Sequence, residues 1–248
     1  MRSAGTGAGT LIGGDEEFQL IVAERFGVEK PTFQGEGPSC GVPALFIRLS
    51  RCNLTCSWCD TTYTWDWSRF DPRTESTRQT VANLLAWALG SAVELVVITG
   101  GEPLIQQPSL IPLVRGLLAA GKRVEVETNG TIAPDPALLV DGVCFNVSPK
   151  LANSDVEQDR RIKPAALEAF ASSGRAVFKF VTRTVAELDE IGALVERYGL
   201  DPVYVMPEGT TPEGLIAITR VLADAVAARR WHLTQRLHVL AFTDKRGR

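Results

Sequence analysis

Short apolar runs alternate with helical patterns along most of the chain. Residues 93–98 (VELVVI) are almost wholly apolar, as is typical of a strand buried on both faces of a parallel sheet. Residues 81, 84, 85 and 88 are apolar at the spacing of one helix face. The predicted strands are 18–26, 42–50, 93–98, 123–127, 143–147, 175–181 and 202–206, and the predicted helices are 77–89, 110–120, 164–172, 185–198 and 212–230. This order predicts an α/β fold with a parallel sheet.

Polar or glycine-rich loops directly follow several of the predicted strands. They are the cysteine-containing loop after residue 50, TGGEP at 99–103, TNG at 128–130, SPK at 148–150 and PEG at 207–209. The carboxyl ends of parallel strands meet at one edge of a sheet or barrel, and the loops at that edge build ligand sites. We therefore expect these loops to form one pocket.

Length and composition restrict the class of protein. The 248 residues are 45% hydrophobic and 22% charged, which is an ordinary globular balance. Residues 1–16 are rich in glycine, serine, threonine and alanine, so we expect a flexible tail there and a single domain over 17–248. No apolar stretch reaches the roughly 20 residues of a membrane-spanning helix, and the amino-terminal segment lacks a signal peptide's apolar core, so we expect a cytoplasmic protein. The net charge of −3 argues against nucleic-acid binding.

The cysteines indicate a metal or cluster site. The chain contains five of them, Cys40, Cys52, Cys56, Cys59 and Cys144. Three lie within eight residues at the spacing C-x3-C-x2-C, and an odd, clustered set does not indicate a disulfide framework. A structural zinc site normally requires a fourth ligand. A 4Fe–4S cluster on three cysteines instead leaves one iron open to a small molecule. A zinc-binding interaction module remains the alternative from a different class.

The C-x3-C-x2-C loop followed by GGEP at 100–103 resembles the radical S-adenosylmethionine (SAM) enzymes. The resemblance implies an abbreviated partial β/α barrel and a 4Fe–4S cluster whose open iron binds SAM. It implies that Trp58 packs near the adenine and that residues 99–102 hold the methionine part. Two adjacent glycines allow the backbone to approach a ligand closely.

Further motifs narrow the resemblance over residues 18–242. FQGEGP at 33–38, CDT at 59–61, ETNG at 127–130 and SPK at 148–150 together resemble the 7-carboxy-7-deazaguanine synthases. That family implies a lyase converting 6-carboxy-5,6,7,8-tetrahydropterin to 7-carboxy-7-deazaguanine and ammonia, with SAM regenerated, in 7-deazapurine biosynthesis such as the queuosine pathway. It implies Mg²⁺ as a further cofactor, a homodimer, an electron donor such as flavodoxin or ferredoxin, and neither a nucleic-acid nor a membrane partner. The alternative is another radical SAM enzyme such as a glycyl-radical activase, although activases often carry extra cysteines.

The resemblance also implies roles for individual residues. The cluster ligands are Cys52, Cys56 and Cys59, and Thr61 helps to bind Mg²⁺, since a hydroxyl oxygen suits a hard cation. The substrate-binding residues are Phe33, Gln34, Gly35, Glu36, Arg48 and Thr99. The cofactor-binding residues are Trp58, Gly101, Glu102, Glu127, Ser148 and Lys150. Arg48 is expected to pair with the substrate carboxylate, whose two oxygens match a guanidinium fork. No side chain is assigned as the catalytic group, and His232 and His238 are interpreted as structural, although segment 235–238 resembles a late family motif.

Overall fold

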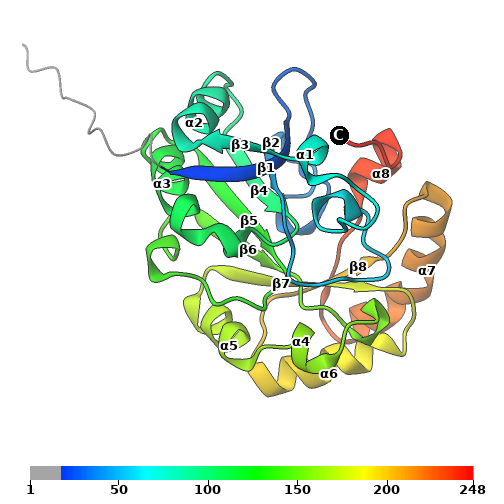
Figure 1. The fold of residues 1–248 in the computed structure, drawn as a ribbon. Coiled ribbons are helices and arrows are strands. Elements are labelled where there is room, and N and C mark those ends of the chain that lie inside the picture. The colour runs from blue at the N-terminus through cyan, green and yellow to red at the C-terminus, as the bar shows by residue number, and fades with distance from the viewer. Residues whose placement is uncertain (1–17, 248) are drawn as a thin grey trace, which may run out of the picture.

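The computed structural model describes residues 18–247, whose strands form one curved sheet in the order β3-β1-β2-β4-β5-β6-β7-β8-β9 (Figure 1). The strands are β1 (Gln19–Phe26), β2 (Ala44–Leu49), β3 (Thr77–Thr80), β4 (Leu95–Gly100), β5 (Arg123–Thr128), β6 (Val143–Val147), β7 (Ala176–Thr182), β8 (Val203–Pro207) and β9 (His232–Leu233). The pairs from β2 through β9 are parallel, whereas β1 is antiparallel to both β2 and β3. The sheet is therefore a partial barrel of the kind expected.

Most of the helices lie around the outer side of this sheet (Figure 1). The helices of the described residues are α1 (Pro72–Glu75), α2 (Val81–Leu89), α3 (Gln107–Ala119), α4 (Gln158–Arg161), α5 (Pro164–Ser173), α6 (Glu187–Tyr198), α7 (Pro212–Ala228) and α8 (Leu237–Phe242). In α6, Leu188, Ile191 and Leu194 recur at helical spacing and join the main hydrophobic core. The helix ends at Gly199, whose φ of 65° is the left-handed conformation that favours glycine at this position. None of the helices over residues 18–247 is long and apolar enough to cross a membrane.

The predicted helix 77–89 is wrong in its first turn. Thr77–Thr80 is instead strand β3, which pairs with β1, and α2 begins at Val81. The Thr80 hydroxyl accepts a hydrogen bond from the backbone N–H of Asn83 at 3.2 Å, which caps the helix and fixes its start. The short elements α1, α8 and β9 were not predicted. The tail expected over residues 1–16 lies outside the described residues.

Strand register brings three polar side chains of the predicted site together. Arg48 on β2 is directly opposite Thr99 on β4. Thr99 follows the Ile98–Val126 pair, so it lies level with Glu127 on β5. Because alternate residues of a strand point to opposite faces, the intervening Ile98 and Val126 are buried under the helices while these polar residues line the inner face.

Candidate active site

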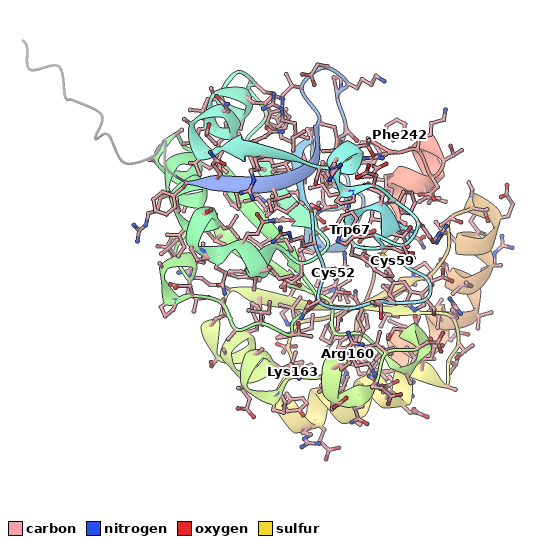
Figure 2. All side chains as sticks on the ribbon, viewed as in Figure 1. Cys52, Cys59, Trp67, Arg160, Lys163 and Phe242 are labelled. Carbon is pink, nitrogen blue, oxygen red and sulfur yellow. The ribbon has the colours of Figure 1, made fainter. Side chains whose placement is uncertain are left out.

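The predicted loops line one cavity at the carboxyl ends of the strands. Its wall includes the cysteine loop, residues 99–101 at the end of β4, 127–129 at the end of β5, Ser148 and Lys150 after β6, and Glu208 after β8. Figure 2 shows Cys52 and Cys59 near one another in the middle of the molecule, with Phe242 of α8 above them in this view. The expectation of a single pocket is therefore confirmed for these loops.

Cys52, Cys56 and Cys59 all line this cavity. Burial raises the pKa of the Cys52 thiol to about 12 and also raises the pKa of Cys56, so binding iron as thiolates would release protons. Among the described residues, no three His, Cys, Asp or Glu side chains close around a single metal ion. Three thiols around one cavity fit a cluster that leaves one iron open to a ligand, whereas a structural zinc normally closes its fourth position with a protein ligand.

Gly101 packs directly against the cysteine loop. A Cβ at this position would lie 2.1 Å from the carbonyl oxygen of Arg51, so no other residue fits without moving the backbone. The backbone N–H of Glu102 donates to the same carbonyl at 2.8 Å. The loop after β4 is thereby attached to the start of the segment that carries the cluster ligands.

Glu102 connects two loops and does not line the cavity. Its buried carboxylate accepts hydrogen bonds from the backbone N–H of Asn129 at 2.7 Å, the hydroxyl of Thr128 at 2.9 Å and the backbone N–H of Leu104 at 2.9 Å. Burial raises its pKa, although these donors favour the ionised form. This geometry supports a role in holding the loops after β4 and β5 and does not support the expected direct contact with the cofactor.

Trp58, Ser148 and Lys150 form one wall of the cavity. The ammonium of Lys150 donates to the Ser148 hydroxyl at 2.8 Å and lies 5.3 Å from the centre of the Trp58 ring. The Trp58 indole N–H donates to Oδ1 of Asn153 at 3.3 Å. These contacts fix a flat aromatic surface and a cation beside the cysteine loop, which suits a ligand that combines an adenine ring with a carboxylate.

Arg48 presents a guanidinium to the cavity. Its Nε donates to Oε1 of Glu24 at 2.8 Å, while neither Nη atom makes a hydrogen bond to any other described residue. Burial alone would lower the pKa of Arg48, but Tyr63, Glu24 and other acidic groups outweigh it and raise the pKa. Arg48 is therefore charged, and its two outer nitrogens are available to an anion.

Thr99 and Gln34 direct their side chains to protein partners. The Thr99 hydroxyl donates to Oε2 of Glu127 at 2.7 Å. The buried amide of Gln34 donates to Oε1 of Glu127 at 3.1 Å and to Oε2 of Glu125 at 3.4 Å, and its oxygen accepts from the backbone N–H of Glu36 at 3.2 Å. The backbone of Gln34 is also paired, since its N–H donates to the carbonyl of Val42 at 2.8 Å and its carbonyl accepts from the N–H of Gly41 at 2.7 Å. Gln34 therefore orients the 33–36 loop through bonds to protein groups.

Glu36 lies within a buried ion-pair network. It pairs with Lys179 on β7 and, at 3.3 Å, with Nε of Arg236 just before α8. Burial alone would raise the pKa of Glu36, but the two cations hold it well below its usual range. Burial alone would lower the pKa of Lys179, but Glu36 and Glu127 outweigh it and raise the pKa. The cavity floor therefore keeps fixed charges of both signs.

Phe33 and Gly35 pack against α8 at the mouth of the cavity. The Phe33 ring stacks on Phe242 with their centres 5.2 Å apart. A Cβ at Gly35 would lie 2.1 Å from Nδ1 of His238, so the absence of a side chain is what admits the imidazole. His238, which was interpreted as structural, lines the cavity, whereas His232 does not.

Thr61 also lines the cavity, next to Asp60. Its hydroxyl lies 3.6 Å from Sγ of Cys59, and its carbonyl accepts from Thr64. Asp60 forms an ion pair with Arg236. A hydroxyl and a carboxylate at the cavity wall are oxygen donors that suit a hard cation, so the residues present fit Mg²⁺.

Sequence reasoning missed Lys179, Arg236 and Glu24, which hold the predicted residues in place. Lys179 lies in the otherwise apolar strand AVFKFVT, and a lysine within a buried strand is a signal for a paired functional charge. Arg236 falls within segment 235–238, whose resemblance to a late family motif is a signal that could have found it. Glu24 lies at a half-buried position of β1, where a charged residue is ordinary and carries no comparable signal.

Comparison with known proteins decides the family. The sequence model of the radical SAM superfamily matches residues 46–165. A 7-carboxy-7-deazaguanine synthase from Pyrobaculum aerophilum is 38% identical over 88% of this chain and 94% of its own length. The chain belongs to the 7-carboxy-7-deazaguanine synthase family. Another synthase of this family, from Rhodopirellula baltica, is 34% identical over 93% of this chain and 90% of its own length.

A solved structure of this synthase family agrees with the fold. QueE from Escherichia coli is 30% identical, with a TM-score of 0.68 over 89% of this chain and 95% of that one. As a 7-carboxy-7-deazaguanine synthase family member, the chain is a radical SAM lyase of deazapurine biosynthesis, with a 4Fe–4S cluster and SAM as its cofactors. A glycyl-radical activase and a zinc-binding module are not favoured.

Proposed function

We propose that this chain converts 6-carboxy-5,6,7,8-tetrahydropterin to 7-carboxy-7-deazaguanine and ammonia, as in queuosine-type pathways. The observation that carries the proposal is one cavity lined both by three cysteines and by Arg48, whose outer nitrogens are available to a carboxylate. Substrate and product differ by one ammonia, so the ring contraction needs no net oxidant. When bound, the cluster and SAM would supply the radical that removes a hydrogen atom from C6, and return of a hydrogen atom to the rearranged substrate radical would regenerate SAM.

On the cofactor side, we assign binding and orientation to four residues beyond the cysteines. Gly101 brings the loop after β4 close to the cysteine loop, and Glu102 holds that loop against the next one. Lys150 and Trp58 form a cationic and aromatic wall beside Cys56. These contacts position the cofactor and exclude water from it.

On the substrate side, Arg48 pairs with the carboxylate as a charge-assisted fork. Glu36 lines the same cavity as an acceptor for the donor edge of the pterin. Glu127 was expected on the cofactor side, but it accepts hydrogen bonds from Gln34 and Thr99, so we assign it to the pterin as well. Lys179 keeps both carboxylates in place. Thr61 contributes a hydroxyl to a Mg²⁺ that neutralises charge around the carboxylate. Lys179 stays protonated, so it compensates the two acids and does not accept a proton from the substrate.

The wider setting follows the same family resemblance. We propose a homodimer with one domain over residues 17–248 that receives its electron from a flavodoxin or ferredoxin. We place it in the cytoplasm, and the five cysteines, all free thiols, agree with a reducing compartment.

An anaerobic product assay tests the proposed reaction. The reconstituted enzyme is incubated with a chemical reductant, SAM and the carboxylated tetrahydropterin, and the products are analysed by mass spectrometry. We expect a product lighter than the substrate by one ammonia, and none when SAM is omitted or when the pterin lacks its carboxylate. An enzyme that cleaves SAM but leaves this pterin unchanged would have a different substrate.

A further inference from the structure

We propose that Arg246, near the carboxyl terminus, positions Arg48 for the substrate carboxylate by holding Glu24 between them. Arg246 and Glu24 are positioning residues in this inference, since Glu24 contacts Arg48 and neither is placed against the substrate. The inference rests on the proposed function of Arg48. It gives a role to a basic residue in segment 243–247, which follows α8 and forms no helix or strand.

Glu24 on β1 is the centre of this arrangement. Its Oε1 accepts hydrogen bonds from Nε of Arg48 at 2.8 Å and from the hydroxyl of Tyr63 at 2.6 Å. Its Oε2 faces Nε of Arg246 at 3.3 Å. The Glu24 side chain is only 14% exposed, so each carboxylate oxygen has a defined partner in a largely buried setting.

Arg246 joins three segments that are distant in sequence. Its Nη1 pairs with Oε2 of Glu75, the last residue of α1, at 2.7 Å. Its guanidinium carbon lies 3.9 Å from the centre of the Tyr63 ring, which is short for a cation–π contact. Figure 1 shows the end of α8 close to α1, in agreement with this contact. Arg246 thus connects β1, α1 and the loop that follows the cluster cysteines.

This arrangement determines which edge of Arg48 faces the cavity. A carboxylate beside an arginine tends to form a two-nitrogen fork with it. Here Tyr63 shares Oε1 and Arg246 occupies Oε2, so Glu24 engages only Nε of Arg48. The Nη atoms therefore remain free for the carboxylate of a substrate. Without Arg246, Oε2 of Glu24 becomes available to the Nη atoms of Arg48. Glu24 then competes with the substrate carboxylate for these atoms.

Direct binding measurements on the reconstituted enzyme test this without depending on turnover. Equilibrium dialysis under anaerobic conditions gives the dissociation constants for 6-carboxytetrahydropterin, for tetrahydropterin without the carboxylate, and for SAM. Arg246→Ala is expected to weaken binding of the carboxylated pterin by roughly three- to fivefold, the upper range for a partly exposed ion pair. Binding of the uncarboxylated pterin and of SAM should not change. Arg246→Lys should recover part of the loss, since an ammonium can still hold Oε2.

A matched control and a double mutant separate positioning from general stabilisation. Arg197→Ala removes another exposed arginine that packs on a tyrosine, 5.2 Å from Tyr198 on α6 and outside the cavity, and should leave all three constants unchanged. In an Arg48→Ala background, Arg246→Ala should have no further effect on the carboxylated pterin, because the two residues act as one unit. Equal weakening of both pterins by Arg246→Ala, or additive effects with Arg48→Ala, would overturn the inference.

The Arg48→Ala variant separates a failure of the proposed function of Arg48 from a failure of the positioning role of Arg246. If Arg48→Ala weakens both pterins equally, Arg48 does not bind the carboxylate and the proposed function loses its support. If Arg48→Ala selectively weakens the carboxylated pterin while Arg246→Ala has no effect, the proposed function stands and only the role of Arg246 is wrong.

Discussion

The indole N–H of Trp65 donates a hydrogen bond to Sγ of Cys59 across 3.3 Å. Trp65 immediately follows a short 3-10 segment, Thr62–Thr64, that turns the chain back after the cysteine motif. Hydrogen bonds to the sulfur ligands of an iron–sulfur cluster stabilise the added negative charge of its reduced state. With a cluster bound to Cys59, the Trp65 donor would therefore make that cluster easier to reduce.

Trp65→Phe is expected to keep the cluster but lower its reduction potential, because the ring remains and only the N–H donor is lost. The shift should be roughly 20–60 mV, equivalent to about 0.5–1.5 kcal/mol for one electron. A redox titration followed by electron paramagnetic resonance measures it. Trp67→Phe is the control, since Trp67 is 40% exposed and donates no side-chain hydrogen bond within the described residues. The same shift in both variants would exclude a specific effect of the Trp65 donor.

Replacing any one of Cys52, Cys56 and Cys59 with alanine should abolish the cluster's visible absorbance and the activity together, because each removes one of three ligands. Anaerobic reconstitution followed by iron and sulfide analysis measures the loss. Cys144→Ala and Cys40→Ala should retain both, since neither residue lines the cavity. Loss of the cluster in Cys40→Ala would contradict the three-ligand arrangement and its open iron.

Thr61→Ala should keep the cluster and blunt the response to magnesium, since it removes the hydroxyl assigned to that ion. Thr61→Ser retains the oxygen and should keep more of the response. The measurement is the turnover rate after chelation and stepwise addition of Mg²⁺. If chelation leaves the turnover rate of the unmutated enzyme unchanged, Thr61 does not bind a required Mg²⁺. Its role would then be limited to its contacts with Cys59 and Thr64.

Glu36→Gln is expected to destabilise the fold at pH 7 by about 3 kcal/mol, because Lys179 and Arg236 each lose one of their two buried anionic partners and keep only Glu127 and Asp60. The pKa of Glu36 is depressed in the folded state, so the stability it contributes is present above its unfolded pKa of roughly 4.3 and is lost as pH falls toward the folded pKa. Denaturant-induced unfolding gives the free energy of unfolding of the unmutated protein and of Glu36→Gln. The difference between these two free energies should therefore become smaller as pH falls below about 4. A difference that stays constant with pH would show that Glu36 is not ionised in the native protein.

The sequence predicts most of the sheet because its strands are locally distinct. Residues 93–98 are apolar enough to indicate a buried strand, and β4 forms over Leu95–Gly100. Thr77–Thr80 is predicted as the first turn of a helix but forms a strand. This short polar strand forms because it pairs with β1, and the hydrophobic pattern of a local sequence window does not reveal such pairing. Helix α8 is likewise stabilised by a distant contact, the packing of Phe242 on Phe33.

The same distinction applies to the site. The cluster cysteines lie within eight residues, so their spacing can be recognised directly. The ion pairs of Glu36 with Lys179 and Arg236 join residues separated by 143 and 200 positions. No sequence window contains such partners, and only the closure of the sheet brings them together. The engagement of Gln34 and Glu102 with protein groups could not be predicted for the same reason.

The proposed conversion is tested most directly by counting molecules of product formed per molecule of SAM consumed, using the wild-type enzyme and the carboxylated tetrahydropterin under anaerobic reducing conditions. Because the hydrogen removed from C6 is replaced from the same cofactor, many molecules of 7-carboxy-7-deazaguanine should form for each SAM that is lost. Consumption of one SAM per product, or cleavage of SAM with no 7-carboxy-7-deazaguanine, would contradict the proposed reaction.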